Sequence, residues 1–317
     1  METGQDRRHD PDDSLATFVH YQKDTVFAFS SLPCYAQRVR RGICKMCLLD
    51  KELVSSHLLP AALYHYCRNP ECSPIRVGAK VHPTDRQIED YLLCRDCEIV
   101  LSRGGETWVI PRLATMERKF PLFDLLTEQP PSLSEGGADV YLAANNPSFK
   151  SDKLAHFAMG IFWKAAVHSW RCDDRITNID LGPYANGVRE GLLGEDRFPE
   201  NICLQVAIST PAKAQILFIN PYEGRRSEWH SFFAYVLGVL FVIHVGKQVR
   251  DASNLCFYQN PGHPIWVWDQ IHSDFEKVFA TQYRNAYKTQ SLFRAKARCE
   301  KALAALASPS GSAARDE

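Results

Sequence analysis

The chain has 317 residues, of which 45% are hydrophobic and 23% are charged, and these are the proportions of a soluble globular protein. Lysine plus arginine and aspartate plus glutamate each number 37, so the formal net charge is zero. No overall field therefore draws the chain to nucleic acid or to an anionic membrane, and any such attraction must come from a local patch. This length allows one large domain or two ordinary ones.

No secretion signal or membrane segment is expected. The opening residues, "METGQDRRHDPDDSLATF", are polar and charged and lack the apolar core of a signal peptide. The most apolar run, 232–246, contains a histidine and is shorter than the roughly 20 residues that a membrane span needs. We therefore expect a cytoplasmic protein without a membrane partner. The cysteines number 11, and in a reducing compartment close cysteine pairs indicate metal binding.

The order of segments predicts two domains joined by a linker. Residues 25–126 are rich in cysteine and turns, whereas 127–150 are rich in proline, glycine, serine and acid, which indicates a loop or domain boundary. Residues 151–307 form a second domain of mixed α+β type in this prediction. The start of the chain, 1–24, and its small-residue tail, 308–317, are predicted to be disordered.

Periodicity predicts the elements of the second half. Apolar residues recur at helical spacing in 151–171, with Ser151 or Asp152 as the cap, and 184–194 is predicted to be a short helix closed by glycine. The remaining predicted elements are strands at 202–209, 214–221 and 263–270, a buried strand or core helix at 232–246, and a last helix at 273–307. No motif in this half identifies a reaction.

Two C-x-x-C pairs, Cys44 with Cys47 and Cys94 with Cys97, carry the clearest chemical signal. A tight turn aims both thiolates of such a pair at one ion, and two pairs complete a tetrahedral zinc site. A site of four thiolates has no open position, so this zinc would be structural. The insert between the pairs contains Cys67 and Cys72, which are alternative ligands, and His65 and His82, which we interpret as ordinary surface or loop residues.

The order of the first cysteine pair, "SSHLLPAALY", "YLLCRDCE" and a later glutamate resembles the HNH endonuclease superfamily. The similarity is to the branch whose ββα-metal motif is held by two zinc knuckles, and it covers roughly residues 40–110. A looser similarity through "FAMGIFWKAAV" and "GVREGLLG" is to uncharacterised bacterial HNH-like proteins. The resemblance implies a zinc-stabilised ββα-metal domain followed by a mixed α+β domain, and a metal-dependent endonuclease that cleaves DNA in phage or mobile-element defence.

The same resemblance implies roles for three residues. His57 matches the general base, which deprotonates water for attack on a phosphate, and a near-neutral pKa suits that task. A single divalent ion, Mg²⁺ or Mn²⁺, would neutralise charge on the phosphate and on the leaving oxygen. Glu98 falls where the family usually has an asparagine, and Glu106 falls where a late metal ligand could lie. Both glutamates are therefore candidate ligands of the divalent ion.

The sequence departs from the family pattern at two positions. Ser56 replaces an acid or histidine that would ligate the metal, and Glu98 cannot donate a hydrogen bond when it is ionised. "HLLPAALY" is also typical of a helix entry, with Ser55 or Ser56 as the N-cap and Pro60 in the first turn. Glycines 104 and 105 are expected to end or bend the helix that carries the two glutamates.

Basic residues near the cysteine pairs predict a surface for double-stranded DNA. They are Arg38, Arg40, Arg41, Lys45, Arg95 and Arg103. An alternative function is a catalytically inactive zinc module that recognises nucleic acid or a protein partner, and Ser56 favours this alternative. In a third interpretation the second domain carries the main activity or binds a protein partner.

Overall fold

A computed structural model describes residues 40–66, 75–76, 82–83, 87–115, 119–172, 175–214, 218–224 and 229–269. All of them belong to one compact unit that runs from Arg38 to the end of the chain. Several predictions fall outside the described residues: the disordered ends, the helix at 273–307, and the roles of Arg38, Cys67 and Cys72. The described fold is of mixed α+β type.

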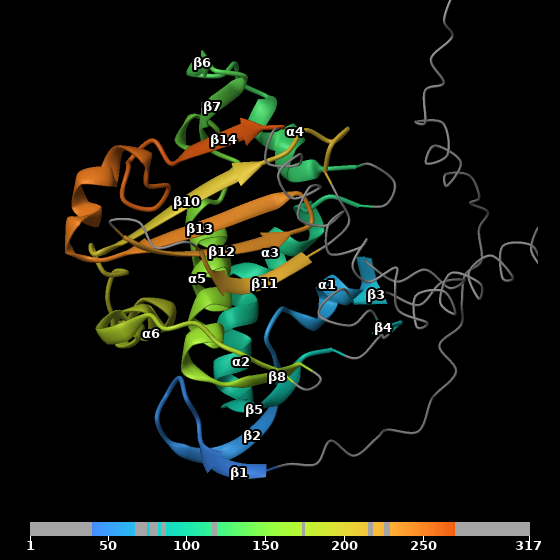
Figure 1. The fold of residues 1–317 in the computed structure, drawn as a ribbon, viewed down its shortest axis with the longest axis vertical. Coiled ribbons are helices and arrows are strands. Elements are labelled where there is room, and N and C mark those ends of the chain that lie inside the picture. The colour runs from blue at the N-terminus through green and yellow to red at the C-terminus, as the bar shows by residue number, and fades with distance from the viewer. Residues whose placement is uncertain are drawn as a thin grey trace, which may run out of the picture. The chain divides into compact units, whose positions relative to one another are not determined.

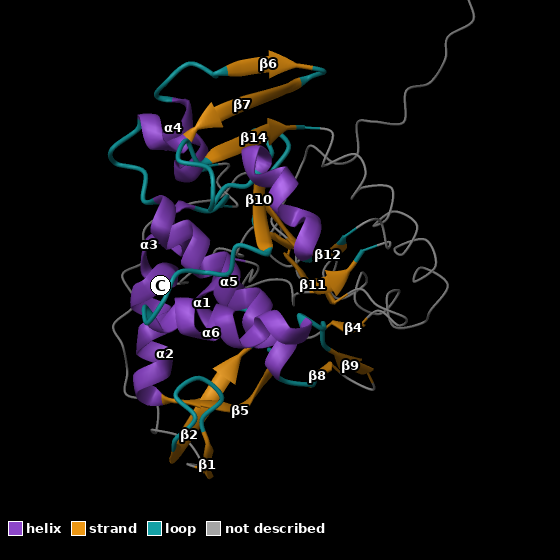
Figure 2. Cartoon of the chain, turned by 90° about the vertical axis from the view of Figure 1, so that its left-hand side faces the viewer, coloured by secondary structure: helices purple, strands orange, loops and turns teal. Residues whose placement is uncertain are grey.

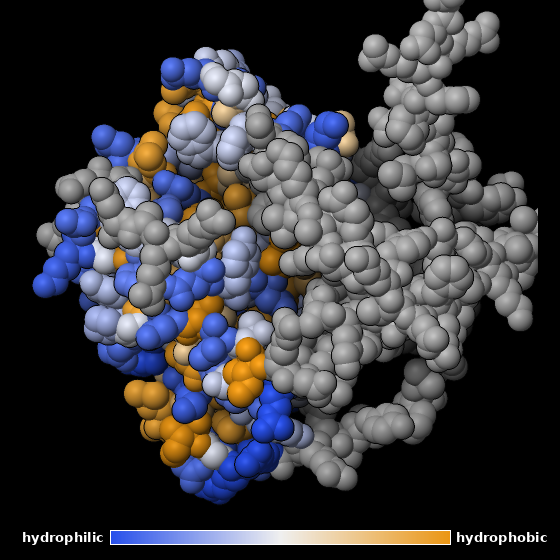
Figure 3. Space-filling view, in the orientation of Figure 1, coloured by the Kyte–Doolittle hydropathy of each residue, from blue (hydrophilic) through white to orange (hydrophobic). Residues whose placement is uncertain are grey.

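A three-stranded antiparallel sheet carries both cysteine pairs. Its strands, in spatial order, are β1 (Arg40–Ile43), β2 (Asp50–His57) and β5 (Glu89–Cys94). The first cysteine pair lies in the turn between β1 and β2, and the second begins where β5 ends. Hydrophobic residues remain at the surface at the end of the molecule that carries β1 (Figure 3).

Short elements interrupt this sheet between β2 and β5. They are α1 (Ala61–Tyr66), β3 (Ile75–Arg76) and β4 (His82–Pro83), of which β3 and β4 pair with each other. The helix expected in "HLLPAALY" is therefore present, beginning directly after Pro60. The predicted N-cap role of Ser55 and Ser56 is wrong, because both residues lie in β2.

One continuous helical segment follows β5. It consists of α2 (Arg95–Leu101), the π-helix η1 (Ser102–Glu106), α3 (Thr107–Val109) and the 3₁₀ turn η2 (Ile110–Arg112). The expected break at Gly104 and Gly105 is replaced by the π-helix. A Cβ at Gly105 would lie 2.6 Å from the Phe157 backbone nitrogen and 2.7 Å from the Lys153 carbonyl oxygen. Glycine is therefore required here because the next long helix approaches too closely for a side chain.

That next helix, α5 (Ser151–Val167), is buried along most of its length. Its first residue agrees with the prediction, although the residue at its N-cap is Lys150 and makes no side-chain capping bond. Figure 1 and Figure 2 show α5 beside α2, between the small sheet and a larger one. Helix α6 (Ala185–Leu193) packs on α5 and ends at Gly194, whose φ of 74° is the left-handed conformation that favours glycine.

The larger sheet has seven strands and covers α5. In spatial order they are β11 (Phe218–Glu223), β12 (His230–Val236), β13 (Val239–Val245), β10 (Ile202–Ile208), β14 (Pro264–Trp268), β7 (Ala138–Leu142) and β6 (Leu133–Glu135). Its pairs are antiparallel except β10 with β14, which is parallel. The apolar run at 232–246 forms most of the hairpin β12–β13, so it is strand and not helix.

The remaining described elements connect these layers. They are α4 (Pro121–Thr127), η3 (Ala143–Asn145), the hairpin β8 (Trp170–Cys172) and β9 (Arg175–Thr177), η4 (Gly182–Tyr184) and η5 (Lys247–Leu255). The segment 127–150, which we expected to be a linker, supplies β6 and β7 to the large sheet. One large hydrophobic cluster contains buried residues from both predicted domains, among them Leu101 of α2 and Phe157 of α5. The sequence halves thus share one interior.

Candidate metal centre and histidine–acid site

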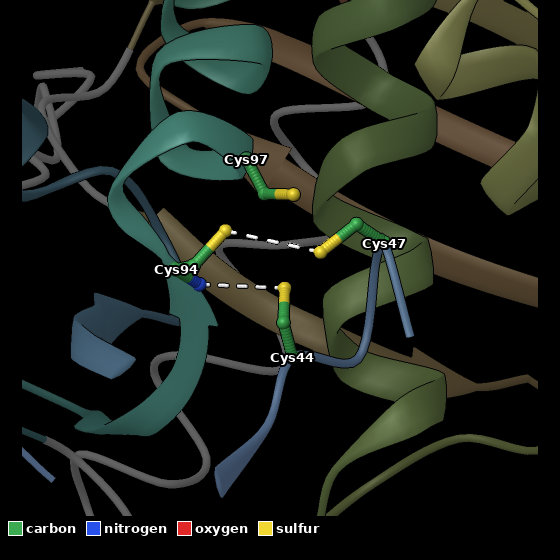
Figure 4. A group of neighbouring side chains, drawn as sticks. All are labelled: Cys44, Cys47, Cys94 and Cys97. Carbon is green, nitrogen blue, oxygen red and sulfur yellow. Dashed lines mark hydrogen bonds between the residues drawn. The ribbon is translucent and has the colours of Figure 1, made fainter. Parts of the chain in front are cut away.

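The structure brings the four cysteines of the two pairs together. Their sulfur atoms all lie within 4.8 Å of one another, and Figure 4 shows the side chains converging from the β1–β2 turn and from the start of α2. The Cys47 and Cys94 sulfurs are 3.9 Å apart, far beyond a disulfide bond. Zinc–sulfur bonds of about 2.3 Å in a tetrahedron separate the sulfurs by about 3.8 Å, so the cluster fits a tetrahedral ion.

The protonation chemistry of the cluster also suits a cation. Burial and neighbouring cysteines raise the pKa of the Cys97 thiol. Burial opposes ionisation of Cys44 as well, but hydrogen bonds from the backbone of Cys47 and Cys94 offset it, and the pKa of Cys44 lies below its ordinary value. Cys44 therefore loses its proton more readily than an ordinary cysteine, and a bound cation would favour ionisation of all four thiols.

Two contacts hold the first knuckle against the rest of the protein. The Lys45 backbone N–H donates to the Leu92 carbonyl at 3.2 Å, and Arg189 of α6 donates from Nη1 to the Met46 carbonyl at 3.1 Å. Met46 itself is completely buried. The knuckle is thus fastened by β5 on one side and by a helix of the second half of the chain on the other.

His57 ends β2 directly opposite Glu89 of β5. Its Nε2 lies 3.3 Å from Oε2 of Glu89, and the same oxygen accepts a 2.6 Å hydrogen bond from Ser55 Oγ. Ser55 and His57 are two residues apart in a strand, so both side chains point to the face on which Glu89 lies. The carboxylate therefore orients the imidazole.

Burial lowers the pKa of His57 below its ordinary value. The Glu89 carboxylate opposes this shift, Lys164 adds to it, and Glu98 and a Gln87 hydrogen bond oppose it further. Because the folded-state pKa lies below 6.5, the imidazole is neutral at pH 7 and able to accept a proton.

Ser56 has a structural role. Its side chain is fully buried, and its Oγ accepts the Leu93 N–H at 3.1 Å. The β2–β5 register shifts between Val54 and Ser55, and the serine hydroxyl bonds to the β5 backbone beside this irregularity. Ser56 therefore points into the interior, away from the carboxylate that His57 and Ser55 contact.

Glu98 and Glu106 lie on the helical segment behind His57. Oε1 of Glu98 is buried and has no hydrogen-bond partner among the described residues. Burial raises the pKa of Glu106, Lys164 opposes this, and the charge of Glu98 adds to it. The buried Lys164 of α5 connects the two parts of the site, because its Nζ donates to the His57 carbonyl at 2.8 Å and lies 3.9 Å from Oε1 of Glu106.

The three predicted catalytic side chains thus share one electrostatic neighbourhood without forming a compact ligand set. Among the described residues, the four cysteines are the one group of three or more His, Cys, Asp or Glu whose ligand atoms all lie within 4.8 Å of one another. His57, Glu98 and Glu106 do not meet that limit, and a divalent ion at the two glutamates stays a prediction.

The predicted DNA-contacting residues that the structure describes all lie at the surface. Arg40 and Arg41 are on β1, Lys45 is in the knuckle, Arg95 opens α2 and Arg103 lies in η1. Arg41 forms an exposed ion pair with Asp50 at 3.3 Å.

Sequence reasoning missed Glu89 and Lys164. Glu89 carries no local signal, since its importance follows from the strand register that places it opposite His57. Lys164 does carry a local signal, because it is the one charged residue in "FAMGIFWKAAV". A lone lysine in an apolar helix needs a buried partner.

We found no protein-family model, no curated protein and no solved structure that matches this chain. Among the described helices, none is both long enough and apolar enough to cross a membrane.

Proposed function

We propose that the protein is a metal-dependent HNH-like endonuclease that cleaves double-stranded DNA. The observation that carries the proposal is the order of parts from the first cysteine pair to the helical segment that follows β5. A strand ends in a neutral, carboxylate-oriented histidine, a second strand pairs with it, and a helix then carries two acids into the same electrostatic neighbourhood. This is the order of the ββα-metal motif that the sequence resembles.

In this proposal His57 is the general base. Its lowered pKa keeps the imidazole unprotonated at neutral pH, and Glu89 holds Nε2 while stabilising the imidazolium that forms when a proton arrives. Lys164 holds the backbone of His57 in place by donating a hydrogen bond to its carbonyl oxygen. His57 thus accepts the proton, while Glu89 orients its ring and Lys164, from the second half of the chain, holds its backbone.

Glu98 and Glu106 would hold the divalent ion. The orphaned buried oxygen of Glu98 is a ligand atom without a partner, and carboxylate oxygens are the donors that Mg²⁺ and Mn²⁺ prefer. When bound, such an ion stabilises negative charge on the phosphate and on the leaving oxygen.

We assign the four-cysteine centre to structural zinc. Four sulfur ligands select zinc over hard cations and leave no open position for water. Metal analysis should find about one tightly held zinc per chain. Cys44→Ser should lose the ion and cooperative folding, since the binding free energy of such a site is folding free energy. A stable, zinc-free Cys44→Ser protein would contradict this assignment.

The nuclease proposal is tested with supercoiled plasmid and added Mg²⁺ or Mn²⁺. Wild type should nick the plasmid, and His57→Ala and Glu106→Ala should each lower the rate by about 100-fold or more. His230→Ala is the matched control, because its side chain is 60% exposed on β12. Nicking that persists undiminished in both site variants would refute the residue assignment.

A catalytically inactive zinc module is the second candidate, and the position of Ser56 favours it. The residue where the family keeps a metal ligand is buried in the sheet, so this ligand is missing. DNA binding with no nicking under any divalent metal would support the inactive module. A role in phage or mobile-element defence applies to either candidate.

A further inference from the structure

The turn that holds the first cysteine pair displays three aliphatic side chains to solvent. Ile43, Leu48 and Leu49 are 56%, 55% and 56% exposed. We call these three residues the knuckle tip. Figure 3 shows hydrophobic residues gathered at this end of the molecule, with hydrophilic residues beside them.

The backbone at Leu48 is costly for a leucine. Its φ is 61°, in the left-handed region that glycine adopts without penalty. The turn is closed on both sides of it, because the Leu48 N–H donates to the Cys44 carbonyl and the Cys44 N–H donates to the Leu49 carbonyl, both at 2.9 Å. Packing does not explain the leucine, since its side chain faces solvent. An exposed apolar side chain kept at a strained position indicates a use for that side chain.

Charged side chains of both signs surround the tip, and exposed Asp50 and Glu52 of β2 pair with Ile43 and Arg41 in the strand register. Arg40 and Arg41 lie on the adjacent strand β1 and Lys45 lies within the turn, and all three are exposed. The ion pair between Arg41 and Asp50 is itself exposed and therefore weak. Arg40, Arg41 and Lys45 exceed the two acids by one charge, and an apolar point with this excess of positive charge is complementary to a polyanion that has an apolar interior.

The small size of the tip favours a nucleic-acid occupant over a protein. A stable protein interface takes about 800 Å² from each partner, whereas three half-exposed aliphatic side chains on one turn offer roughly 300 Å². Architectural DNA-binding proteins, by contrast, insert one or two leucine, isoleucine or phenylalanine side chains between base steps and contact the flanking phosphates with basic residues.

We propose that the knuckle tip is a wedge for the minor groove of duplex DNA. Leu48 and Leu49 enter between base pairs and bend the duplex, while Arg40, Arg41 and Lys45 neutralise the adjacent phosphates. The inference rests on the proposed function, because it takes duplex DNA as the substrate. The zinc site and the bond from Arg189 to the Met46 carbonyl keep the wedge rigid as it unstacks the bases.

The test uses the full-length, zinc-loaded protein without added magnesium or manganese. Fluorescence anisotropy measures affinity for a duplex, and energy transfer between dyes at its two ends measures the bend. The double variant Leu48→Ser, Leu49→Ser should bind about 10-fold more weakly and fail to bend the duplex. Leu133→Ser is the matched control, because that leucine is 50% exposed on β6 in the other sheet. Lys45→Ala should reduce the slope of log affinity against log salt by about 1.

Leu48→Gly separates the wedge from the fold. Glycine relieves the positive φ, so this variant should keep its zinc and melt no lower than wild type, yet bend DNA less.

Unchanged affinity and bending in the double variant, or failure of wild type to bind the duplex, would overturn the inference. Self-association that the double variant abolishes would also overturn it and would assign the tip to a second copy of the chain. Plasmid nicking is scored separately, so tip-dependent bending without nicking refutes the nuclease alone, and nicking with tip-independent binding refutes the wedge alone.

Discussion

At the scale of single residues, the Glu89 carboxylate is the strongest influence that opposes the effect of burial on the pKa of His57. Its negative charge raises the pKa of the imidazole, which burial lowers. Glu89→Gln should therefore lower the pKa of His57 further, and the acidic limb of the activity profile should move to lower pH. Titration of the His57 ring protons by NMR measures the shift. Asp90→Asn is the control, because Asp90 contacts His168 instead, at 2.9 Å. An unchanged or raised pKa of His57 in Glu89→Gln would contradict this assignment.

The burial of Ser56 leads to a second prediction at the scale of single residues. Replacing it by aspartate restores the residue type of the family pattern, but the new carboxylate would be buried in the sheet beside Leu93. Ser56→Asp should cost about 2–4 kcal/mol of unfolding free energy and should not increase nicking. Chemical denaturation measures this cost, and increased nicking by Ser56→Asp would show that the side chain reaches the site.

At the scale of elements, the close contact between η1 and α5 predicts an unusual response to alanine. Alanine normally stabilises a helix by about 1 kcal/mol relative to glycine. At Gly105 the added methyl would meet backbone atoms of Phe157 and Lys153, which cannot move aside easily. Gly105→Ala should therefore destabilise the protein by about 1–3 kcal/mol, whereas Ser102→Ala in the same π-helix should change the unfolding free energy by less than about 0.5 kcal/mol. A stabilised Gly105→Ala protein would show that the helices are separated in solution.

Local pattern identified many elements but not the contacts between them. The helical period of 151–171 and the closing glycine of 184–194 act within their own turns, so α5 and α6 could be predicted from sequence. The pair at 104–105 was misjudged because a glycine that weakens a helix locally also permits the close approach of another helix. In the same way, the C-x-x-C spacing predicted the cysteine cluster, whereas the partnership of His57 with Glu89 depends on a strand register that the sequence does not state.

At the scale of the whole molecule, the site is assembled from both halves of the chain. Lys164 of α5 bonds to His57, and Arg189 of α6 bonds to the turn that carries the first cysteine pair. Neither contact could be predicted, because each joins residues more than 100 positions apart. The buried lysine is the stronger constraint, since leaving its charge without a partner in the interior would cost several kcal/mol.

A fragment experiment tests this shared interior. Residues 25–126, expressed alone, contain both cysteine pairs but lack α5, against which Leu101 and Gly105 pack. We expect the fragment to bind zinc and yet to unfold without a cooperative transition, because zinc can close the knuckles but cannot replace the missing half of the core. The full chain, with the same zinc content, should unfold cooperatively. Calorimetry and binding of a hydrophobic dye compare the two proteins. A fragment that unfolds cooperatively, with a melting temperature near that of the full chain, would show that 25–126 is an independent domain. The contact with α5 would then not be needed for its folding.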